Sequence, residues 1–157
     1  MTRAEPEHSM TAQDSFQTLK TFFESRESAR QAMRAIKEDV EIGIVIGGIV
    51  DCALFRQGEK PIVEARAAVH PDVVFHIQPE SVEVLSTSTK DQIGEVGVGV
   101  LKEVLAGNIR IEVPGRIWNL LSRGYLDMIK QGGPPVAAFL ARNGLSSVSK
   151  ITSVIKK

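Results

Sequence analysis

The hydrophobic pattern begins with a helical period. From Thr11 to Val40, apolar residues recur every three or four positions among charged ones, which predicts helix. Thr11 is a suitable N-cap, and Ser28 could cap a second helix if the charged run before it divides the segment. Residues 1–10 are polar and have no period, so we expect a flexible tail there and a single domain over residues 11–157.

From Ile42 the period changes to two, which is typical of strands. Gly47 and Gly48 allow a bend or bulge in the first strand region, and a hairpin turn should follow at Gln57 to Lys60. The expected strands lie near residues 42–57, 61–69, 72–78 and 108–113. Pro79 suits the first turn of a short helix that turns Val82 and Leu85 inward.

The strand expected at 61–69 has small residues in the middle of its inner face. Val63, Ala65, Ala67 and Val69 alternate with polar or outward positions there. Helices should cover the sheet face that bears Val63, Ala65, Phe75 and Ile109. Large helix side chains facing Ala65 and Ala67 would leave volume that a close-packed core normally fills.

The stretch from Asp91 to Lys130 predicts helix, strand and helix. In the last of these, Trp118, Leu121, Tyr125 and Ile129 form one apolar line, and a second apolar line runs beside it. A helix lying on a sheet needs an apolar stripe only about 100° wide. The surplus must therefore face another helix, a second subunit or a bound apolar molecule.

Three glycines interrupt the first helix of this stretch, at Gly94, Gly97 and Gly99. Their spacing fits neither nucleotide-binding glycine fingerprint, and no Lys-Ser or Lys-Thr pair follows. Within a helix each glycine costs about 0.8 to 1 kcal/mol relative to alanine, so a helix that keeps them needs close backbone contact or mobility. Alternatively, residues 94–99 form a loop and the helix begins at Val100.

The order of these pieces resembles the sterol carrier protein 2 family over roughly Ile49 to Met128. The markers are the Asp-led strand Asp72-Val-Val-Phe-His-Ile, a Pro-Glu helix start, the helix end Val104-Leu105-Ala106-Gly107, the strand Asn108-Ile-Arg-Ile-Glu-Val, and Gly115 before the closing helix. Two features depart from the family pattern. The segment ahead of Gly107 is longer and carries the three glycines, and Val104-Leu105 replaces a Phe often found there.

The resemblance implies an α+β fold with a five-stranded, mainly antiparallel sheet, helices over one face, and an apolar cavity between them that holds a lipid. The general pocket should survive both departures, whereas the ligand preference could change. The expected lining is Phe75, Val82, Ile93, Val96, Val100, Trp118, Leu121, Tyr125 and Ile129.

Composition excludes several partner classes. The 157 residues carry 19 Lys plus Arg and 19 Asp plus Glu, without a basic cluster, so neither a nucleic-acid surface nor an anionic membrane patch is favoured. The longest apolar run, Ile42 to Val50, is about half of the ~20 residues that a membrane-spanning helix needs. A single Cys52 and no charged-then-apolar leader favour the cytoplasm.

Candidate chemistry is sparse. His70 and His76 are six residues apart on an extended segment, about 20 Å and too far to share a metal. Cys52 alternates with apolar neighbours, as a small hydrophobe does. Asp51, Glu64 and Asp72 are expected to face solvent. We therefore expect no catalytic residue, no metal and no cofactor.

Two classes of function remain. The first is non-catalytic binding or transfer of an apolar ligand such as a fatty acyl chain, a fatty acyl-CoA, a sterol or an isoprenoid-like molecule. The second is an interaction or assembly protein, a homodimer for example, in which a partner covers the surplus apolar faces of Ile117 to Ile129 and Pro134 to Leu140. An enzyme of another type is the third and least favoured reading.

Overall fold

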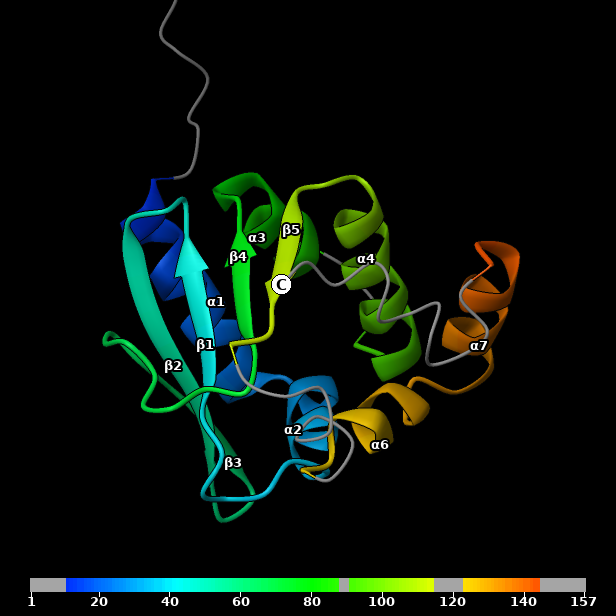
Figure 1. Cartoon of the computed structure of the whole chain (residues 1–157), viewed down its shortest axis with the longest axis horizontal. Helices are drawn as coiled ribbons and strands as arrows, with labels where there is room; N and C mark the ends of the chain where they lie inside the picture. Colours follow the sequence, from blue (N-terminus) through cyan, green and yellow to red (C-terminus); the bar gives the residue numbers. More distant parts are fainter. Residues whose placement is uncertain (1–10, 88–90, 115–122, 145–157) are drawn as a thin grey trace, which may run out of the picture.

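The computed structural model describes residues 11–87, 91–114 and 123–144. A five-stranded sheet in the order β3-β2-β1-β4-β5 has helices over one face (Figure 1). The strands are β1 (Ile42–Ile46), β2 (Val50–Gln57), β3 (Lys60–Glu64), β4 (Val74–Ile77) and β5 (Ile109–Glu112). The helices are α1 (Ala12–Ser25), α2 (Glu27–Met33), α3 (Pro79–Ser86), α4 (Ile93–Leu105), α6 (Tyr125–Lys130) and α7 (Gly133–Arg142). The α+β class expected from the sequence is confirmed.

The sheet is mixed, and three of its four strand pairs are antiparallel. β1 pairs with β2, β2 with β3 and β4 with β5 in antiparallel fashion, whereas β1 and β4 run parallel. Gly47 and Gly48, both with positive φ, make the turn between β1 and β2 at the expected bend. The register brings the inward side chains of all five strands onto one face. They are Ile42, Ile44, Cys52, Leu54, Val63, Phe75, Ile77, Ile109 and Ile111.

The amino-terminal helical segment is divided, as the charged run suggested. Thr11 caps α1 through a capping box with Asp14, and α1 ends at Ser25. Ser28 is not the cap of the second helix, because α2 already begins at Glu27. The carboxylate of Asp91 takes that role by accepting hydrogen bonds from the backbone N–H groups of Glu27 and Ser28. Helix α2 ends at Met33, so helix does not extend to Val40.

The expected strand at 61–69 is too long, because β3 ends at Glu64. Ala65 and Ala67 are exposed, and Val69 is 61% exposed. The Arg66 N–H bonds the Glu64 carbonyl oxygen, which turns the chain away from β2. The prediction that Ala65 and Ala67 lie under the helices and leave volume there is therefore wrong. Val63, Phe75 and Ile109 do face the helices.

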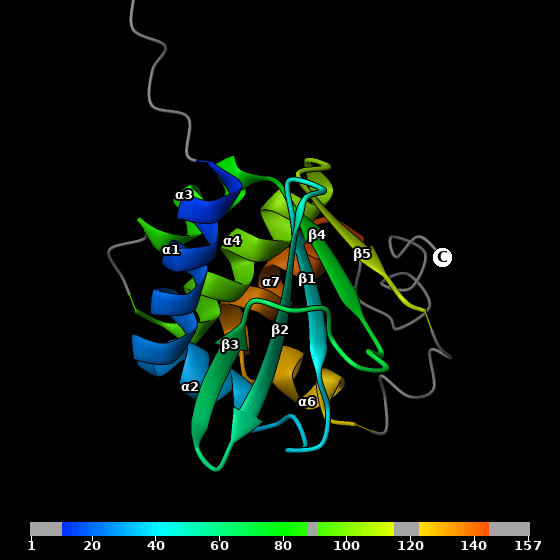
Figure 2. The same ribbon diagram turned by 90° about the vertical axis from the view of Figure 1, so that its left-hand side faces the viewer.

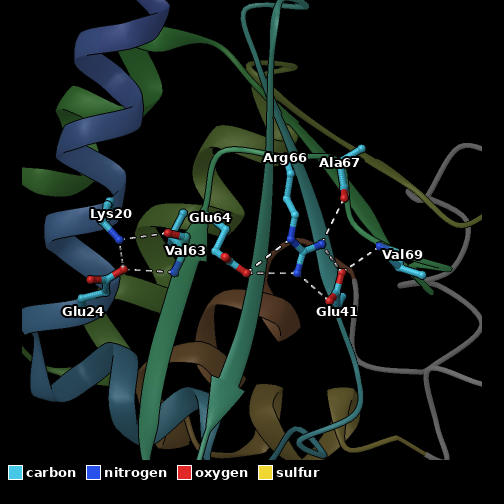
Figure 3. A network of polar contacts seen from close by, with 8 residues as sticks. All are labelled: Lys20, Glu24, Glu41, Val63, Glu64, Arg66, Ala67 and Val69. Atoms are coloured by element: carbon cyan, nitrogen blue, oxygen red, sulfur yellow. Dashed lines mark hydrogen bonds and ion pairs between the residues drawn. The ribbon is translucent and has the colours of Figure 1, made fainter.

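Helix α1 protects the outer edge of β3. Lys20 donates a hydrogen bond of 3.0 Å to the Val63 carbonyl oxygen, and the Val63 N–H donates one of 3.1 Å to Glu24 (Figure 3). Lys20 and Glu24 also pair with each other along the helix. An unpaired strand edge invites pairing with another chain, and these contacts occupy both backbone groups of Val63 on that edge.

The connection from β3 to β4 crosses the sheet face that the helices leave open, in front of β2 and β1 (Figure 2). Arg66 makes two hydrogen bonds of 2.8 Å to the carboxylate of Glu41, which also accepts one from the Val69 N–H (Figure 3). The Arg66 guanidinium lies 5.5 Å from the centre of the Phe55 ring. These contacts fix the crossing segment to the residue that precedes β1.

The first testable prediction concerns Glu41. Hydrogen bonding from Arg66, aided by the Val69 N–H, lowers the pKa of the Glu41 carboxyl against the opposing effect of burial. A carboxyl with a lowered pKa stabilises the fold above its unfolded pKa, and that stabilisation is lost as pH falls through the folded pKa. Glu41→Gln should cost about 1 kcal/mol near pH 7. In urea denaturation, the free energies of unfolding of the wild type and the variant should converge as pH falls from about 6 to 3.

The control for this prediction is Glu59→Gln. Glu59 is exposed in the turn between β2 and β3 and has no polar partner among the described residues, so its replacement should leave stability almost unchanged. If the free energies of unfolding of Glu41→Gln and the wild type differ by the same amount at every pH, the Glu41 carboxyl does not have a lowered pKa in the folded protein.

Candidate functional site

A cavity of about 330 Å³ lies between the inner face of the sheet and the helices. The sheet contributes apolar side chains from β1, β2, β4 and β5, including Ile44, Phe75 and Ile109. Every described helix also borders it. Helix residues on the lining include Leu19, Phe22 and Phe23 of α1, Ala29 and Ala32 of α2, Val82 and Leu85 of α3, Val96, Val100 and Val104 of α4, Met128 and Ile129 of α6, and Val136 and Leu140 of α7. The walls are therefore apolar in every layer of the fold.

The glycines of α4 set the position of the helix that walls one side of the cavity. Of the two alternatives left by the sequence, the helical one is correct, because Gly94, Gly97 and Gly99 all lie within α4. A Cβ on Gly94 would lie 2.6 Å from the Gly132 carbonyl oxygen, and one on Gly97 would lie 2.9 Å from Val136 Cγ2. Both contacts are closer than a side chain tolerates. The glycines thus allow α4 to approach α7 and the turn before it.

The helix expected to run to Lys130 does not continue through Gly124. Gly124 has a φ of 97°, and α6 begins only at Tyr125. A Cβ on Gly124 would lie 1.9 Å from the Ala35 carbonyl oxygen, so the chain packs backbone to backbone against the segment that follows α2. The pattern failed here because the apolar line continues across a residue whose backbone is left-handed. Residues 115–122 lie outside the described part of the chain.

The structure places seven of the nine expected ligand-binding residues on this cavity. They are Phe75, Val82, Ile93, Val96, Val100, Tyr125 and Ile129. Trp118 and Leu121 lie outside the described residues. Ligand binding by any of the nine stays a prediction. Sequence reasoning did not assign the lining from α1, although the adjacent Phe22 and Phe23 were a signal, since two consecutive aromatics widen the apolar stripe of a helix.

Two lining residues connect the cavity to the protein surface. Leu105 at the end of α4 is 44% exposed, and Ile129 on α6 is 37% exposed. Large apolar side chains that line a cavity and also reach solvent mark where its wall is thin or open. A ligand would thus have apolar surface to follow from the outside inward at these two places.

A small polar cluster lies where β4 and α6 begin. Asp72 is buried at 6% exposure, so the expectation that it faces solvent is wrong, whereas Asp51 and Glu64 are exposed as expected. Arg123 lies 3.4 Å from the Asp72 carboxylate. The Tyr125 hydroxyl is buried and has no hydrogen-bond partner among the described residues. Burial, with the Asp72 charge in second place, raises the pKa of Tyr125 well above its usual value.

The other candidates for chemistry are unreactive or dispersed. Burial, together with the neighbouring Asp51 charge, raises the pKa of the Cys52 thiol to about 11, so little thiolate exists near neutral pH. Within residues 11–87, 91–114 and 123–144, no three His, Cys, Asp or Glu side chains gather as a metal site would require. No helix in this same part of the chain is both long and apolar enough to cross a membrane.

Comparisons with known proteins gave likenesses in structure alone. No family model and no curated protein matches the sequence. A solved structure described as a UbiJ-SCP2 ubiquinone synthesis protein is similar over 74% of this chain and 90% of that chain, with 11% sequence identity and a TM-score of 0.43. Its description names the family that the order of elements resembles. A likeness of this degree does not identify a ligand or a function for this chain.

The second testable prediction concerns the contact between α4 and α7. Gly94→Ala should destabilise the protein by about 1 to 3 kcal/mol, because the added methyl meets a backbone carbonyl oxygen that cannot turn aside. In Gly99→Ala the methyl would lie 3.3 Å from the end of the flexible Leu85 side chain, so the variant should be neutral or up to about 1 kcal/mol more stable. Thermal unfolding of both variants provides the comparison. Equal effects would show that α4 does not depend on this close approach.

Proposed function

We propose that this protein binds an apolar lipid in the cavity between sheet and helices and does not catalyse a reaction. The observation that carries the proposal is the combination of volume and lining, about 330 Å³ enclosed by apolar side chains from every layer. Ligand pockets typically measure about 300 to 1,000 Å³ and are lined mainly by hydrophobic and aromatic residues. The cavity is at the small end of this range, which suits one apolar chain.

The energy of an empty cavity supports an occupant. At about 24 cal/mol per Å³ of unfilled volume, a cavity of about 330 Å³ forgoes roughly 8 kcal/mol of packing energy. That is comparable to the whole unfolding free energy of an ordinary domain, about 5 to 15 kcal/mol. Water would recover little of it, because apolar walls offer few hydrogen-bond partners. An apolar ligand would restore these contacts and stabilise the fold.

The ligand classes that fit are a fatty acyl chain, a fatty acyl-CoA, a sterol and an isoprenoid-like molecule. In each, an apolar body would occupy the cavity. A large headgroup such as CoA would remain outside, near Leu105 or Ile129, where the lining reaches solvent. Carriage or transfer of the lipid between partners in the cytoplasm is the activity that such an arrangement would serve.

The burial of α7 within this chain weakens the alternative hypothesis of an interaction or assembly protein. That hypothesis required the apolar side of residues 134–140 to be covered by another chain. Val136 and Phe139 of α7 are instead buried within this chain, where Val136 packs against Gly97 of α4. A homodimer is thus not needed to cover α7, and the exposed Ile129 is explained equally well as part of the cavity mouth.

The third testable prediction is that a bulkier side chain on the cavity wall displaces the ligand. Val100→Phe should lower affinity for a long-chain fatty acid about tenfold or more while the protein still folds, because the ring occupies space that the chain would use. Lys102→Phe adds a ring of the same size at an exposed position of the same helix and should leave affinity unchanged. Trp118 is the only tryptophan in all three proteins, so its emission can report the titration.

Melting temperature provides an independent readout of the same titration. A ligand at about a hundred times its Kd stabilises the folded state by about 2.7 kcal/mol, which raises the Tm of a domain of this size by about 5 to 10 °C. Absence of any shift with fatty acid, acyl-CoA, sterol and isoprenoid alcohol, combined with a dimer in sedimentation, would favour the assembly reading. If Val100→Phe lowers the melting temperature and no lipid changes the melting temperature of the wild type, Val100 lies in a packed core and not on a ligand cavity.

A further inference from the structure

Two hydroxyl groups on the cavity lining, those of Ser28 and Tyr125, are buried and make no hydrogen bond of good geometry with the described residues. Tyr125 borders the cavity, is 6% exposed, and its hydroxyl has no hydrogen-bond partner among the described residues. The other hydroxyl-bearing residues on the lining have polar neighbours. The Ser86 hydroxyl donates to the Glu83 carbonyl oxygen, and the Ser28 side chain lies close enough to the Asp91 carboxylate to lower the pKa of that group. A buried hydroxyl without a partner is energetically costly, so the Tyr125 hydroxyl favours a ligand that can pair with it.

The charges near Tyr125 are already balanced. Asp72 is buried, and the Arg123 guanidinium stands 3.4 Å from its carboxylate, which leaves one negative and one positive charge together. Arg123 is therefore engaged by Asp72 and is not a spare cation for a ligand. An incoming carboxylate or phosphate would be desolvated beside the Asp72 carboxylate without a counter-charge of its own, which is unfavourable in a buried site.

We propose that Tyr125 marks the polar end of the ligand site and that the ligand carries a neutral oxygen there, such as a ketone, aldehyde, ester or alcohol, on an otherwise apolar chain. The Tyr125 hydroxyl donates a hydrogen bond to that oxygen. This inference rests on the proposed function, since it requires a lipid in the cavity, and it narrows the ligand class from all lipids to uncharged oxygenated ones. Fatty acids in their ionised form are then the weaker ligands.

The test uses four probes of one chain length: dodecane, dodecan-2-one, 1-dodecanol and dodecanoate. For the wild type at about pH 8, the ketone and the alcohol should bind more tightly than the alkane and the carboxylate. Tyr125→Phe removes only the hydroxyl, so affinity for the ketone should fall about 3- to 10-fold while affinity for dodecane stays within about twofold. The alkane is the matched control, because it fills the same cavity without an oxygen.

A second readout separates a binding role from a structural one. If the Tyr125 hydroxyl is reserved for a ligand, Tyr125→Phe without lipid should be at least as stable as the wild type, because it removes an unpaired buried group. A hydroxyl that holds the fold together would lower the melting temperature when it is removed. Added ketone should then stabilise the wild type more than it stabilises the variant.

A third variant tests the charge argument. Asp72→Asn leaves Arg123 without its carboxylate partner, so affinity for dodecanoate should rise about fivefold or more relative to dodecan-2-one. A wild type that binds dodecanoate more tightly than the ketone would overturn the neutral-ligand assignment. If Tyr125→Phe lowers the affinity for dodecane as much as the affinity for the ketone, the proposed hydrogen bond from the Tyr125 hydroxyl is wrong, although the cavity would still bind lipid. If none of the four probes binds the wild type, the proposed function itself fails.

Discussion

The close contact between α4 and α7 is the constraint on which the cavity depends. Gly94 and Gly97 present no side chain to the Gly132 carbonyl oxygen and Val136, so the two helices pack against each other at near-backbone distance. Helices fixed in this way do not have to settle onto the sheet to bury their apolar surface. The volume between them and β1, β4 and β5 can then remain open, with Val96 and Val100 of α4 bordering it. Three glycines in one helix are costly in isolation, and the close approach of α4 to α7 is a physical reason for keeping Gly94 and Gly97.

The sheet is held by contacts that do not involve the cavity. On the open face, Glu41 binds Arg66 and the Val69 N–H, and at the β3 edge α1 binds both backbone groups of Val63. The end of β2 and the turn after it are tied to the segment after α2, since Arg56 donates to the Ile36 carbonyl oxygen and the Gly58 N–H donates to the Glu38 carboxylate. A fold supported from these places can tolerate a poorly filled interior on the helical side. That division of roles fits the proposed binding of an apolar ligand.

The sequence predicted those parts of the structure that a local period determines. Alternation located β1, β4 and β5, and the face bearing Val63, Phe75 and Ile109 was assigned correctly. The errors fall where a distant contact overrides the local pattern. Arg66 pairs with Glu41 just past the end of β3, Gly124 packs against the Ala35 carbonyl so that α6 begins only at Tyr125, and burial beside Arg123 removes Asp72 from solvent. Seven cavity residues were anticipated from apolar surplus and family resemblance together. The adjacent Phe22 and Phe23 signalled the α1 contribution, whereas the burial of the unpartnered Tyr125 hydroxyl depends on tertiary packing, which no spacing rule encodes.

Native mass spectrometry of the protein as purified from cells is the most direct test of the central claim, because it detects a bound ligand and the oligomeric state in one experiment. We predict a monomer of 17.1 kDa that carries one non-covalent adduct, and organic extraction should release that adduct as an uncharged, oxygen-containing lipid. Delipidated protein should regain the same single adduct when the extract is returned. A monomer that carries no adduct and takes up no lipid from the extract would contradict the account. A dimer with the mass of two unliganded chains would also contradict it.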